Sequence, residues 1–200
     1  MHRYGIFPDV HFRGQGPISE AFLRLKITGF HGACRYVHEL PYGYNSRRDD
    51  VTVLFRENRG TCTTKHAVIA TLAHEIELAV HKQVGIYAMT EDLVSGTDKL
   101  LAEFSLPFVP MAHCFLSYED YRVDLTEGNI NGKNRAIVDF LFVQQVEPNI
   151  SERDEYFLYR NAVAEVVLMR PDFVGVDLSR ILKAREQGLK LLRGKVTVAQ

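Results

Sequence analysis

Several features that mark particular classes of protein are missing from this 200-residue sequence. No apolar run approaches the roughly 20 residues that a membrane-spanning helix needs, so we expect a soluble protein. The 24 basic and 25 acidic residues leave a net charge of −1, which gives no basic excess to attract nucleic acid or an anionic membrane. The composition therefore predicts neither a nucleic-acid nor a membrane partner.

Cysteine is also scarce. The chain has three cysteines, an odd number without a pairing pattern, which is typical of a reducing compartment rather than of a disulfide framework. The residues from Met1 to Pro8 lack the apolar segment of a secretory signal peptide. We therefore expect a cytoplasmic protein, and the sequence does not indicate its oligomeric state.

Metal-binding motifs are absent as well. The segment from His74 to Leu78 begins like the zinc motif His-Glu-x-x-His, but leucine stands where the second histidine is needed. His74 and His81 are seven residues apart and point sideways from the face that carries the cysteine described below. We therefore expect neither a metal nor another cofactor.

The stretch from Arg59 to Leu72 joins a turn of small residues to an amphipathic helix that begins at Cys62. The face expected to be buried contains Cys62, His66, Ile69, Ala73, Ile76 and Val80. Gly85 is expected to end the helix. A helix N-terminus carries unpaired N–H groups and a partial positive charge, which favour a thiolate over a thiol. Cys62 is thus a candidate nucleophile, and a small buried core residue is the alternative interpretation.

Residues 111–126 alternate in the way that is typical of a β-hairpin. With residues 119–120 in the turn, Tyr118 pairs with Tyr121, and a shift of the turn by one residue on each strand leaves the register unchanged. The expected strands run from Pro110 to Ser117 and from Tyr121 to Thr126.

The same register brings two polar residues together. His113 lies opposite Thr126, and Asp124 is its diagonal neighbour on the more polar face of the hairpin. Cys114 is expected on the apolar face, because neighbouring strand residues point to opposite sides. The sequence therefore predicts a histidine and a carboxylate within reach of each other, and a core position for Cys114.

A cysteine that opens a helix, a histidine on one strand and Asp-x-Thr on the next resemble the core of the transglutaminase-like cysteine enzymes. The segment from Val84 to Ala88 is similar to the Gly-Ile-Pro-Ala segment that follows the cysteine helix in that family. The resemblance covers about residues 34–130, and it implies a catalytic triad of Cys62, His113 and Asp124. His66, one helical turn after the cysteine, is near enough to contact the thiol, but the family places its base on the strand.

The chain also departs from the family. It has no tryptophan, whereas the family often places one near its active site. An oxyanion donor other than backbone N–H must then come from another side chain. In papain-like folds such a donor lies upstream of the nucleophile, and the candidates in that position are Tyr42, Tyr44 and Asn45.

We expect an α+β fold with a papain/transglutaminase-like core, in which the cysteine helix packs on an antiparallel sheet. Residues 1–150 form this domain, including an irregular N-terminal arm, and residues 151–200 form a helical C-terminal extension packed on the same domain. The apolar run from Ile137 to Val143 is predicted as a central strand. Cys34 is expected to fill the core.

The predicted function is acyl transfer from an amide or isopeptide bond of a peptide or protein to the cysteine. Hydrolysis is the first choice, and crosslinking, with a lysine amine in place of water, is the second. A non-catalytic binding or scaffold module of the same fold is the alternative. Arylamine N-acetyltransferases share the order Cys, His, Asp, but they carry Gly-Gly before the cysteine, where this chain has Arg59, Gly60 and Thr61.

Overall fold

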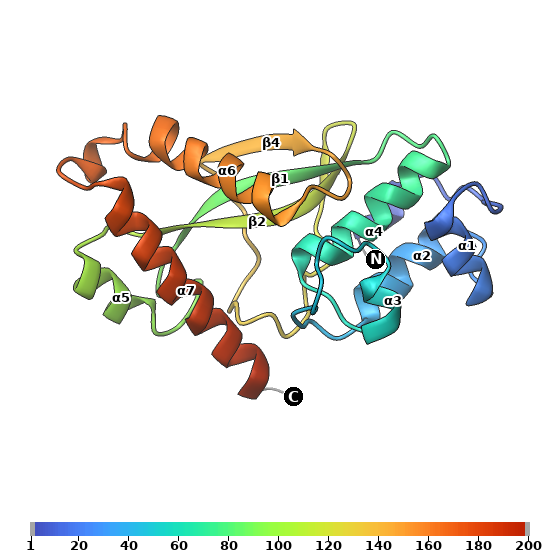
Figure 1. Ribbon diagram of the computed structural model, residues 1–200, viewed down its shortest axis with the longest axis horizontal. Coiled ribbons are helices and arrows are strands. Elements are labelled where there is room, and N and C mark those ends of the chain that lie inside the picture. The colour runs from blue at the N-terminus through green and yellow to red at the C-terminus, as the bar shows by residue number, and fades with distance from the viewer. Residues whose placement is uncertain (1–2, 199–200) are drawn as a thin grey trace. The chain divides into compact units, whose positions relative to one another are not determined.

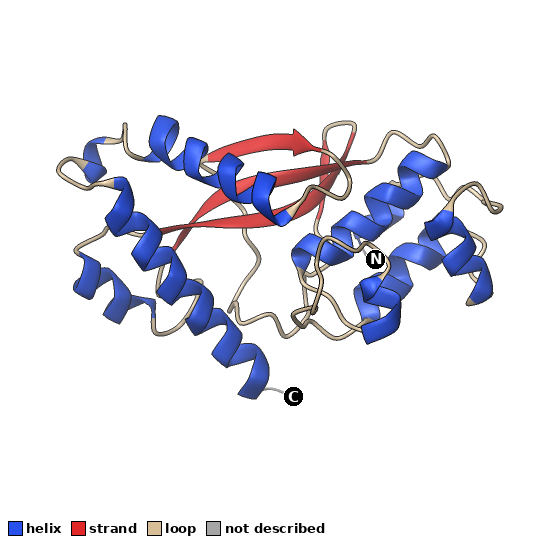
Figure 2. Cartoon of the chain, viewed as in Figure 1, coloured by secondary structure: helices blue, strands red, loops and turns tan. Residues whose placement is uncertain are grey.

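The computed structural model describes residues 3–198, and within them it contains seven α-helices and a four-stranded sheet (Figures 1 and 2). The strands are β1 (His81–Met89), β2 (Val109–Tyr118), β3 (Tyr121–Val123) and β4 (Phe142–Val146). Their order in the sheet is β3-β2-β1-β4, and β2 and β3 are antiparallel. This composition confirms the expected α+β class.

The chain divides into two compact units. The first contains the described residues up to Val84 together with Cys114–Asn129 and Gln145–Glu152. The second contains Gly85–His113, Ile130–Gln144 and the described residues from Arg153 onward. The expected boundary at residue 150 does not coincide with this division. The described residues from Arg153 onward group with two earlier segments, because their apolar side chains pack on those segments.

The first unit contains α1 (Pro17–Arg24), α2 (Phe30–Glu39), α3 (Val53–Glu57) and α4 (Cys62–Glu75), with a short 3-10 helix at Arg3–Ile6 (Figure 1). Helix α4 contacts each of the other three α-helices. The core of this unit includes Phe22, Phe30, Cys34, Leu54, Val68, Ile69, Leu72, Leu116 and Val123. Cys34 is fully buried, as expected, and burial followed by the charge of Asp9 raises its pKa.

Helix α4 is shorter than the sequence predicted. It ends at Glu75, and Gly85 lies inside strand β1, so the expected stop at Gly85 is wrong. Glu77 adopts a left-handed backbone conformation with φ 57°, which turns the chain away from the helix axis. The Glu75 carboxylate accepts hydrogen bonds from the backbone N–H groups of Ile18 and Ser19 at the start of α1. The end of α4 therefore supplies a cap for α1.

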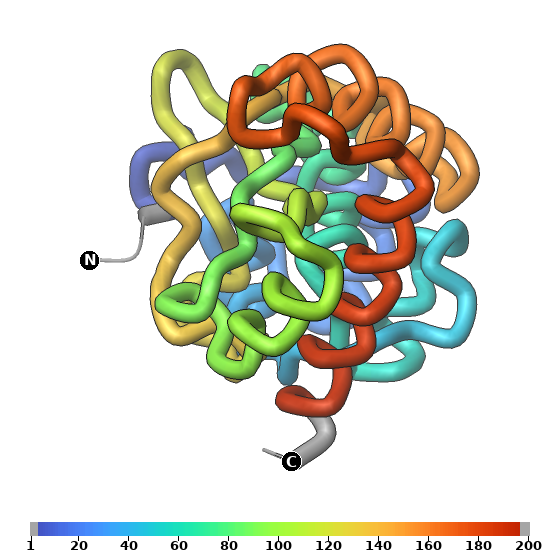
Figure 3. The backbone as a smooth tube through the Cα atoms, turned by 90° about the vertical axis from the view of Figure 1, so that its left-hand side faces the viewer, coloured from blue at the N-terminus to red at the C-terminus, as the bar shows by residue number. Residues whose placement is uncertain are grey.

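The second unit contains α5 (Thr97–Phe104), α6 (Glu152–Ala162) and α7 (Leu178–Val198), and a π-helical turn at Val163–Val167 continues α6. Helices α5 and α7 lie side by side (Figures 1 and 3). The core of this unit includes Ile86, Met89, Val109, Met111, Tyr159, Ile181 and Ala184. The C-terminal extension was predicted to be helical, and within the described residues it contains α6 and α7.

The apolar run from Ile137 to Val143 does not form the predicted central strand. Strand β4 begins only at Phe142 and lies at the edge of the sheet, and residues 124–141 form a loop (Figure 2). Ile137, Phe140 and Leu141 instead pack against the core of the second unit, whereas Val138 is 63% exposed. The run is apolar because part of this loop is buried, which an apolar pattern alone does not distinguish from a strand.

The register of the hairpin was predicted correctly. Tyr118 pairs with Tyr121, and Leu116 pairs with Val123. Strand β3 ends at Val123, however, so Asp124, Leu125 and Thr126 lie outside the strand that was expected to run from Tyr121 to Thr126. None of the helices in residues 3–198 is both long enough and apolar enough to cross a bilayer.

The hairpin turn contains a residue in a conformation that favours glycine. Glu119 has φ 50°, whereas the positive-φ residues do not include Asp120. We expect Glu119→Gly to raise the free energy of unfolding by about 1 kcal/mol, because glycine has no Cβ to clash in this region. Urea unfolding measures the change. Asp120→Gly is the matched control and should give no gain, and equal effects of the two substitutions would contradict this explanation.

Candidate functional site

Cys62 is the first residue of α4 and is half-buried. The helix start is fixed by its own side chains, since the backbone N–H of Thr61 donates to Oγ1 of Thr64 at 3.0 Å. The predicted position of the cysteine, at the positive end of a core helix, is therefore observed. The partial positive charge of a helix N-terminus favours a negatively charged group beside the thiol.

The loop of the three predicted oxyanion donors is fastened to the segment that precedes Cys62. Tyr42 and Gly60 form a parallel bridge, in which the Gly43 N–H donates to the Gly60 carbonyl at 3.2 Å. Tyr42 is buried and Tyr44 is half-buried. The loop that carries the three candidates is thus held beside the segment that precedes Cys62, and their role as oxyanion donors stays a prediction.

Asn45 has a structural task in this loop. Its Nδ2 donates to a Glu57 carboxylate oxygen at 3.1 Å and to the Arg59 carbonyl at 3.0 Å. Its Oδ1 accepts a hydrogen bond from the Thr64 hydroxyl at 2.8 Å. Asn45 therefore ties the loop to the first turn of α4. To act as an oxyanion donor, its side-chain nitrogen would have to give up one of the two hydrogen bonds that it donates.

Asp124 follows strand β3 and begins a turn. Its Oδ1 accepts hydrogen bonds from both the backbone N–H and the hydroxyl of Thr126, each at 2.7 Å. Thr126 is fully buried, so these two donors hold the carboxylate in one orientation. This geometry gives the Asp-x-Thr pattern a physical meaning, because a threonine at the second position after the aspartate supplies both donors.

His66 connects the cysteine to the aspartate turn, which the sequence did not predict. Its Nδ1 lies 2.7 Å from the Cys62 carbonyl oxygen, and its Nε2 accepts the Leu125 backbone N–H at 2.8 Å. The Asp124 Oδ1 lies 3.4 Å from the same Nε2. Cys62 and Asp124 are thus linked through one imidazole ring, and both ring nitrogens are engaged with the main chain.

His113 lies on strand β2, as predicted, and is 2% exposed. Within the second unit its ring stands edge-on to Tyr87, at 6.3 Å between centroids, and stacks on Phe140 at 6.5 Å. Cys114, the next residue, belongs to the first unit and is buried, with its Sγ 3.7 Å from the Thr63 hydroxyl oxygen. The expected burial of Cys114 is confirmed.

Gly85 on β1 allows Phe140 to take this position. A Cβ atom on Gly85 would lie 2.2 Å from Cδ1 of Phe140, which is far inside van der Waals contact. The phenyl ring therefore lies directly against the glycine backbone, and the ring is also the surface on which His113 stacks. Close packing of Phe140 therefore explains why a glycine stands at position 85, in the Gly-Ile pair after the cysteine helix.

Lys65 is a buried cation next to the site. Its ammonium group donates to the carbonyl oxygens of His38 and Leu40 and to Oδ1 of Asn129. All three donors of the ammonium group are thus used, and they join α4 to the end of α2 and to the loop after Asp124. Burial lowers the pKa of Lys65 to about 8, while the charge of Asp124 acts in the opposite direction.

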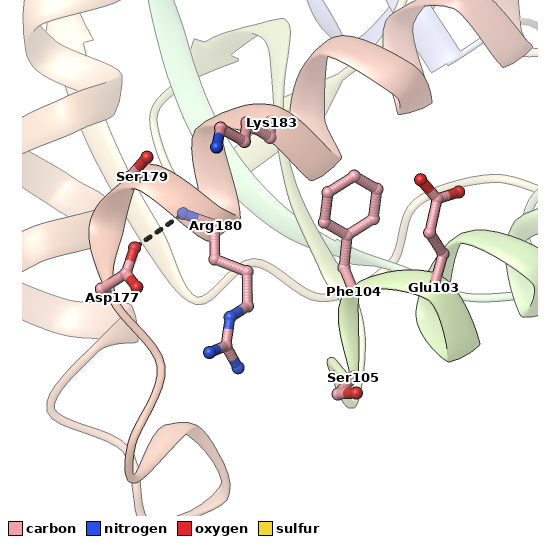
Figure 4. Close-up of a pocket in the computed structure, with 7 residues that line it drawn as sticks. All are labelled: Glu103, Phe104, Ser105, Asp177, Ser179, Arg180 and Lys183. Carbon is pink, nitrogen blue, oxygen red and sulfur yellow. Dashed lines mark hydrogen bonds between the residues drawn. The ribbon is translucent and has the colours of Figure 1, made fainter.

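A separate pocket of about 620 Å³ lies in the second unit, between the end of α5 and the start of α7 (Figure 4). It is lined by Glu103, Phe104, Ser105, Asp177, Ser179, Arg180 and Lys183. Asp177 caps α7 by accepting the Arg180 backbone N–H at 2.8 Å. The lining contains neither cysteine nor histidine, and none of the predicted site residues belongs to it.

The residues that the structure describes contain no group of three or more histidine, cysteine, aspartate or glutamate side chains placed to hold a metal ion. The sequence matches no protein-family model, and no curated protein or solved structure matches it. A function is therefore assigned on the chemistry and geometry of the residues themselves.

The lowered pKa of Lys65 predicts a dependence of stability on pH. Between pH 8 and 10.5 the folded protein loses the Lys65 proton before the unfolded chain does, so the unfolded state binds more protons. The contribution of this group to the free energy of unfolding should therefore rise as the pH increases through that window. We expect Lys65→Met to lack this rise when urea unfolding is measured at several pH values from 7.5 to 10.

Lys183→Met is the matched control, because Lys183 is an exposed lysine on α7. Its stability should follow the pH profile of the unmodified protein. Parallel profiles for the protein and for Lys65→Met would show that the pKa of Lys65 is not lowered in the folded state.

Proposed function

We propose that this protein is a cysteine-nucleophile acyl-transfer enzyme of the papain/transglutaminase-like type, acting on an amide or isopeptide bond of a peptide or protein. Cys62 is the nucleophile, His113 the base and later the acid, and Asp124 the residue that orients the imidazole. No cofactor takes part. We also propose a cytoplasmic location, on the basis of the small odd number of cysteines.

The observation that carries this proposal is the half-buried thiol at the first position of α4, in a residue whose backbone carbonyl is joined through His66 to the turn of Asp124. A helix N-terminus lowers the pKa of a thiol and offers N–H donors to an oxyanion. A cysteine that only filled the core, such as Cys34, would be fully buried and would have a raised pKa. The position of Cys62 favours nucleophilic chemistry over packing.

His113 is a better candidate for the base than His66. Both ring nitrogens of His66 are hydrogen-bonded to the main chain, so His66 would have to break one of these bonds to take the thiol proton. The assignment of His113 rests on the order Cys, His, Asp along the chain, and a His113 variant is its decisive test.

The reaction has two steps. In the first, the Cys62 proton moves to His113, the sulfur attacks the carbonyl carbon, and the leaving amine takes that proton as the C–N bond breaks. In the second, His113 deprotonates a water molecule that attacks the thioester, and the carboxylate product and the thiol are released. An amine in place of water would give crosslinking, and nothing in the site favours an amine over water.

A non-catalytic binding or scaffold module is the second candidate. The chain supports it through the same contacts, because the hydrogen bonds of His66, Thr126 and Lys65 also stabilise the first unit without any chemistry. The two candidates differ in one measurable property, which is whether an acyl group is transferred to Cys62.

The reactivity of the three thiols should differ by orders of magnitude. Cysteines at helix N-termini with a basic partner have pKa values of about 3.5 to 7.5, against about 8.5 for an ordinary thiol. With limiting iodoacetamide at pH 6, peptide mass spectrometry should find Cys62 labelled first, ahead of the buried Cys34 and Cys114. His113→Ala should slow the labelling of Cys62 and leave the circular dichroism spectrum unchanged. Equal labelling of the three thiols would mean that Cys62 is only a packing residue.

Acyl transfer itself should be visible as an adduct. Incubation with glutamine-containing and isopeptide-linked peptides, followed by acid quench and intact mass spectrometry, should show a thioester on Cys62. Cys62→Ala is the control and should show none, and Asp124→Asn should lower the yield at early times because the imidazole loses its orienting charge. A consistent lack of adduct across both substrate classes would favour the scaffold module.

A further inference from the structure

His66 has an unusual position for a helix residue, because its ring is shared between two parts of the first unit. The side chain is fully buried. On one side Nδ1 approaches the carbonyl of Cys62, one turn earlier on α4. On the other side Nε2 meets the N–H of Leu125, which immediately follows Asp124. The imidazole therefore bridges the peptide of the proposed nucleophile and the turn of the proposed triad acid.

These contacts determine which nitrogen carries the proton. A backbone N–H can only donate, so Nε2 must be the acceptor in the bond with Leu125. A backbone carbonyl can only accept, so Nδ1 must donate to Cys62. The ring is thus neutral with its proton on Nδ1, and the contact of 3.4 Å between Nε2 and Asp124 is a close approach rather than an ion pair.

We propose that His66 is a positioning residue, a neutral imidazole that fixes the first turn of α4 against the turn of Asp124 and so holds Cys62 in its reactive orientation. The catalytic part of this inference rests on the proposed function. The two hydrogen bonds of the His66 ring, to the Cys62 carbonyl and from the Leu125 N–H, are called the latch below and belong to the fold itself. A residue needed only to fill volume would not require a donor on one edge and an acceptor on the other.

Loss of this positioning should change the reaction rate by a measurable amount. Small misplacements of a catalytic group, of about 1 Å, change rates by roughly a hundredfold. The carbonyl of Cys62 belongs to the residue that carries the thiol, so loss of the Nδ1 bond frees the turn from which Sγ projects. Loss of the Nε2 bond frees Leu125 and leaves its buried N–H without this acceptor, which destabilises the turn next to Asp124.

Three substitutions separate the two halves of the latch. In His66→Gln the side-chain oxygen can take the place of Nε2 and accept from Leu125, whereas the bond to Cys62 is lost. In His66→Asn the amide nitrogen can take the place of Nδ1 and donate to Cys62, whereas the bond to Leu125 is lost. His66→Leu removes both bonds and keeps an apolar group in the cavity. His74→Gln, at an exposed position of the same helix, is the control.

Two readouts do not depend on activity. The ring nitrogen chemical shifts of His66 should show the Nδ1-H tautomer in the unmodified protein. Hydrogen exchange of the Leu125 amide should be slow in the protein and in His66→Gln, and at least tenfold faster in His66→Asn and His66→Leu. An Nε2-H tautomer, or unchanged exchange in all variants, would overturn the latch.

The third readout is the rate of Cys62 alkylation and, where a substrate is known, kcat and KM. We expect His66→Leu to lower both the alkylation rate and kcat by about ten to a hundredfold, with KM and the pH midpoint unchanged. A shift of the pH midpoint in His66→Leu would identify His66 as the base and overturn the positioning role, and unchanged rates would make it a packing residue.

These measurements also separate the inference from the proposed function. A protein with the Nδ1-H tautomer, slow exchange at Leu125 and latch-dependent thiol reactivity, but without any acyl adduct, would contradict the acyl-transfer function and support the latch. An acyl adduct that forms equally well in His66→Leu would support the function and contradict the latch.

Discussion

The start of α4 is tied to neighbouring segments by side-chain hydrogen bonds, and the arrangement of the first unit depends on this restraint. Helix termini leave backbone groups without intrahelical partners, and here such groups and their neighbours are tied to other segments. Asn45 joins the upstream loop to the first turn, Lys65 joins α4 to the end of α2, and His66 joins it to the turn of Asp124. The thiol of Cys62 projects from the turn that these bonds fix.

Burial of these polar groups costs free energy unless they are hydrogen-bonded, so they restrict how the surrounding elements can be placed. A buried ammonium group or imidazole without partners is strongly unfavourable, so each of these side chains is compatible with only one placement of the elements around it. Lys65 uses three donors on three acceptors, and His66 uses one donor and one acceptor. A shift of α4 by one turn would leave several of these groups without partners, whereas an apolar core tolerates such a shift more easily.

Local patterns predicted the elements that follow a simple period. The start of α4 at Cys62, the hairpin register and the burial of Cys34 and Cys114 all came from spacing and turn chemistry. The end of α4 could not be found in this way, because it depends on Glu77 adopting φ 57° and on Glu75 capping a distant helix. The apolar run before β4 was taken for a central strand, since apolarity reports burial and not conformation.

The bridging role of His66 was outside the reach of the sequence for a related reason. Its spacing from Cys62 placed it one turn away, but whether its ring meets the sulfur or the carbonyl depends on where Leu125 lies, and that depends on the turn after β3. The sequence did contain one signal, which is that His66 lies on a helix face expected to be buried. A buried histidine needs hydrogen-bond partners for its ring nitrogens, so this position indicates a polar contact.

The contact between Gly85 and Phe140 has a consequence for how this sequence can diverge. The ring occupies the space that any side chain at position 85 would need, so a side chain there is compatible only with a displaced or smaller residue at position 140. In a related chain, a larger residue at position 85 should accompany a smaller one at position 140, and that exchange would remove the aromatic surface beside His113. Variation at a glycine inside a strand would then change the surroundings of the histidine without altering any of the proposed catalytic residues.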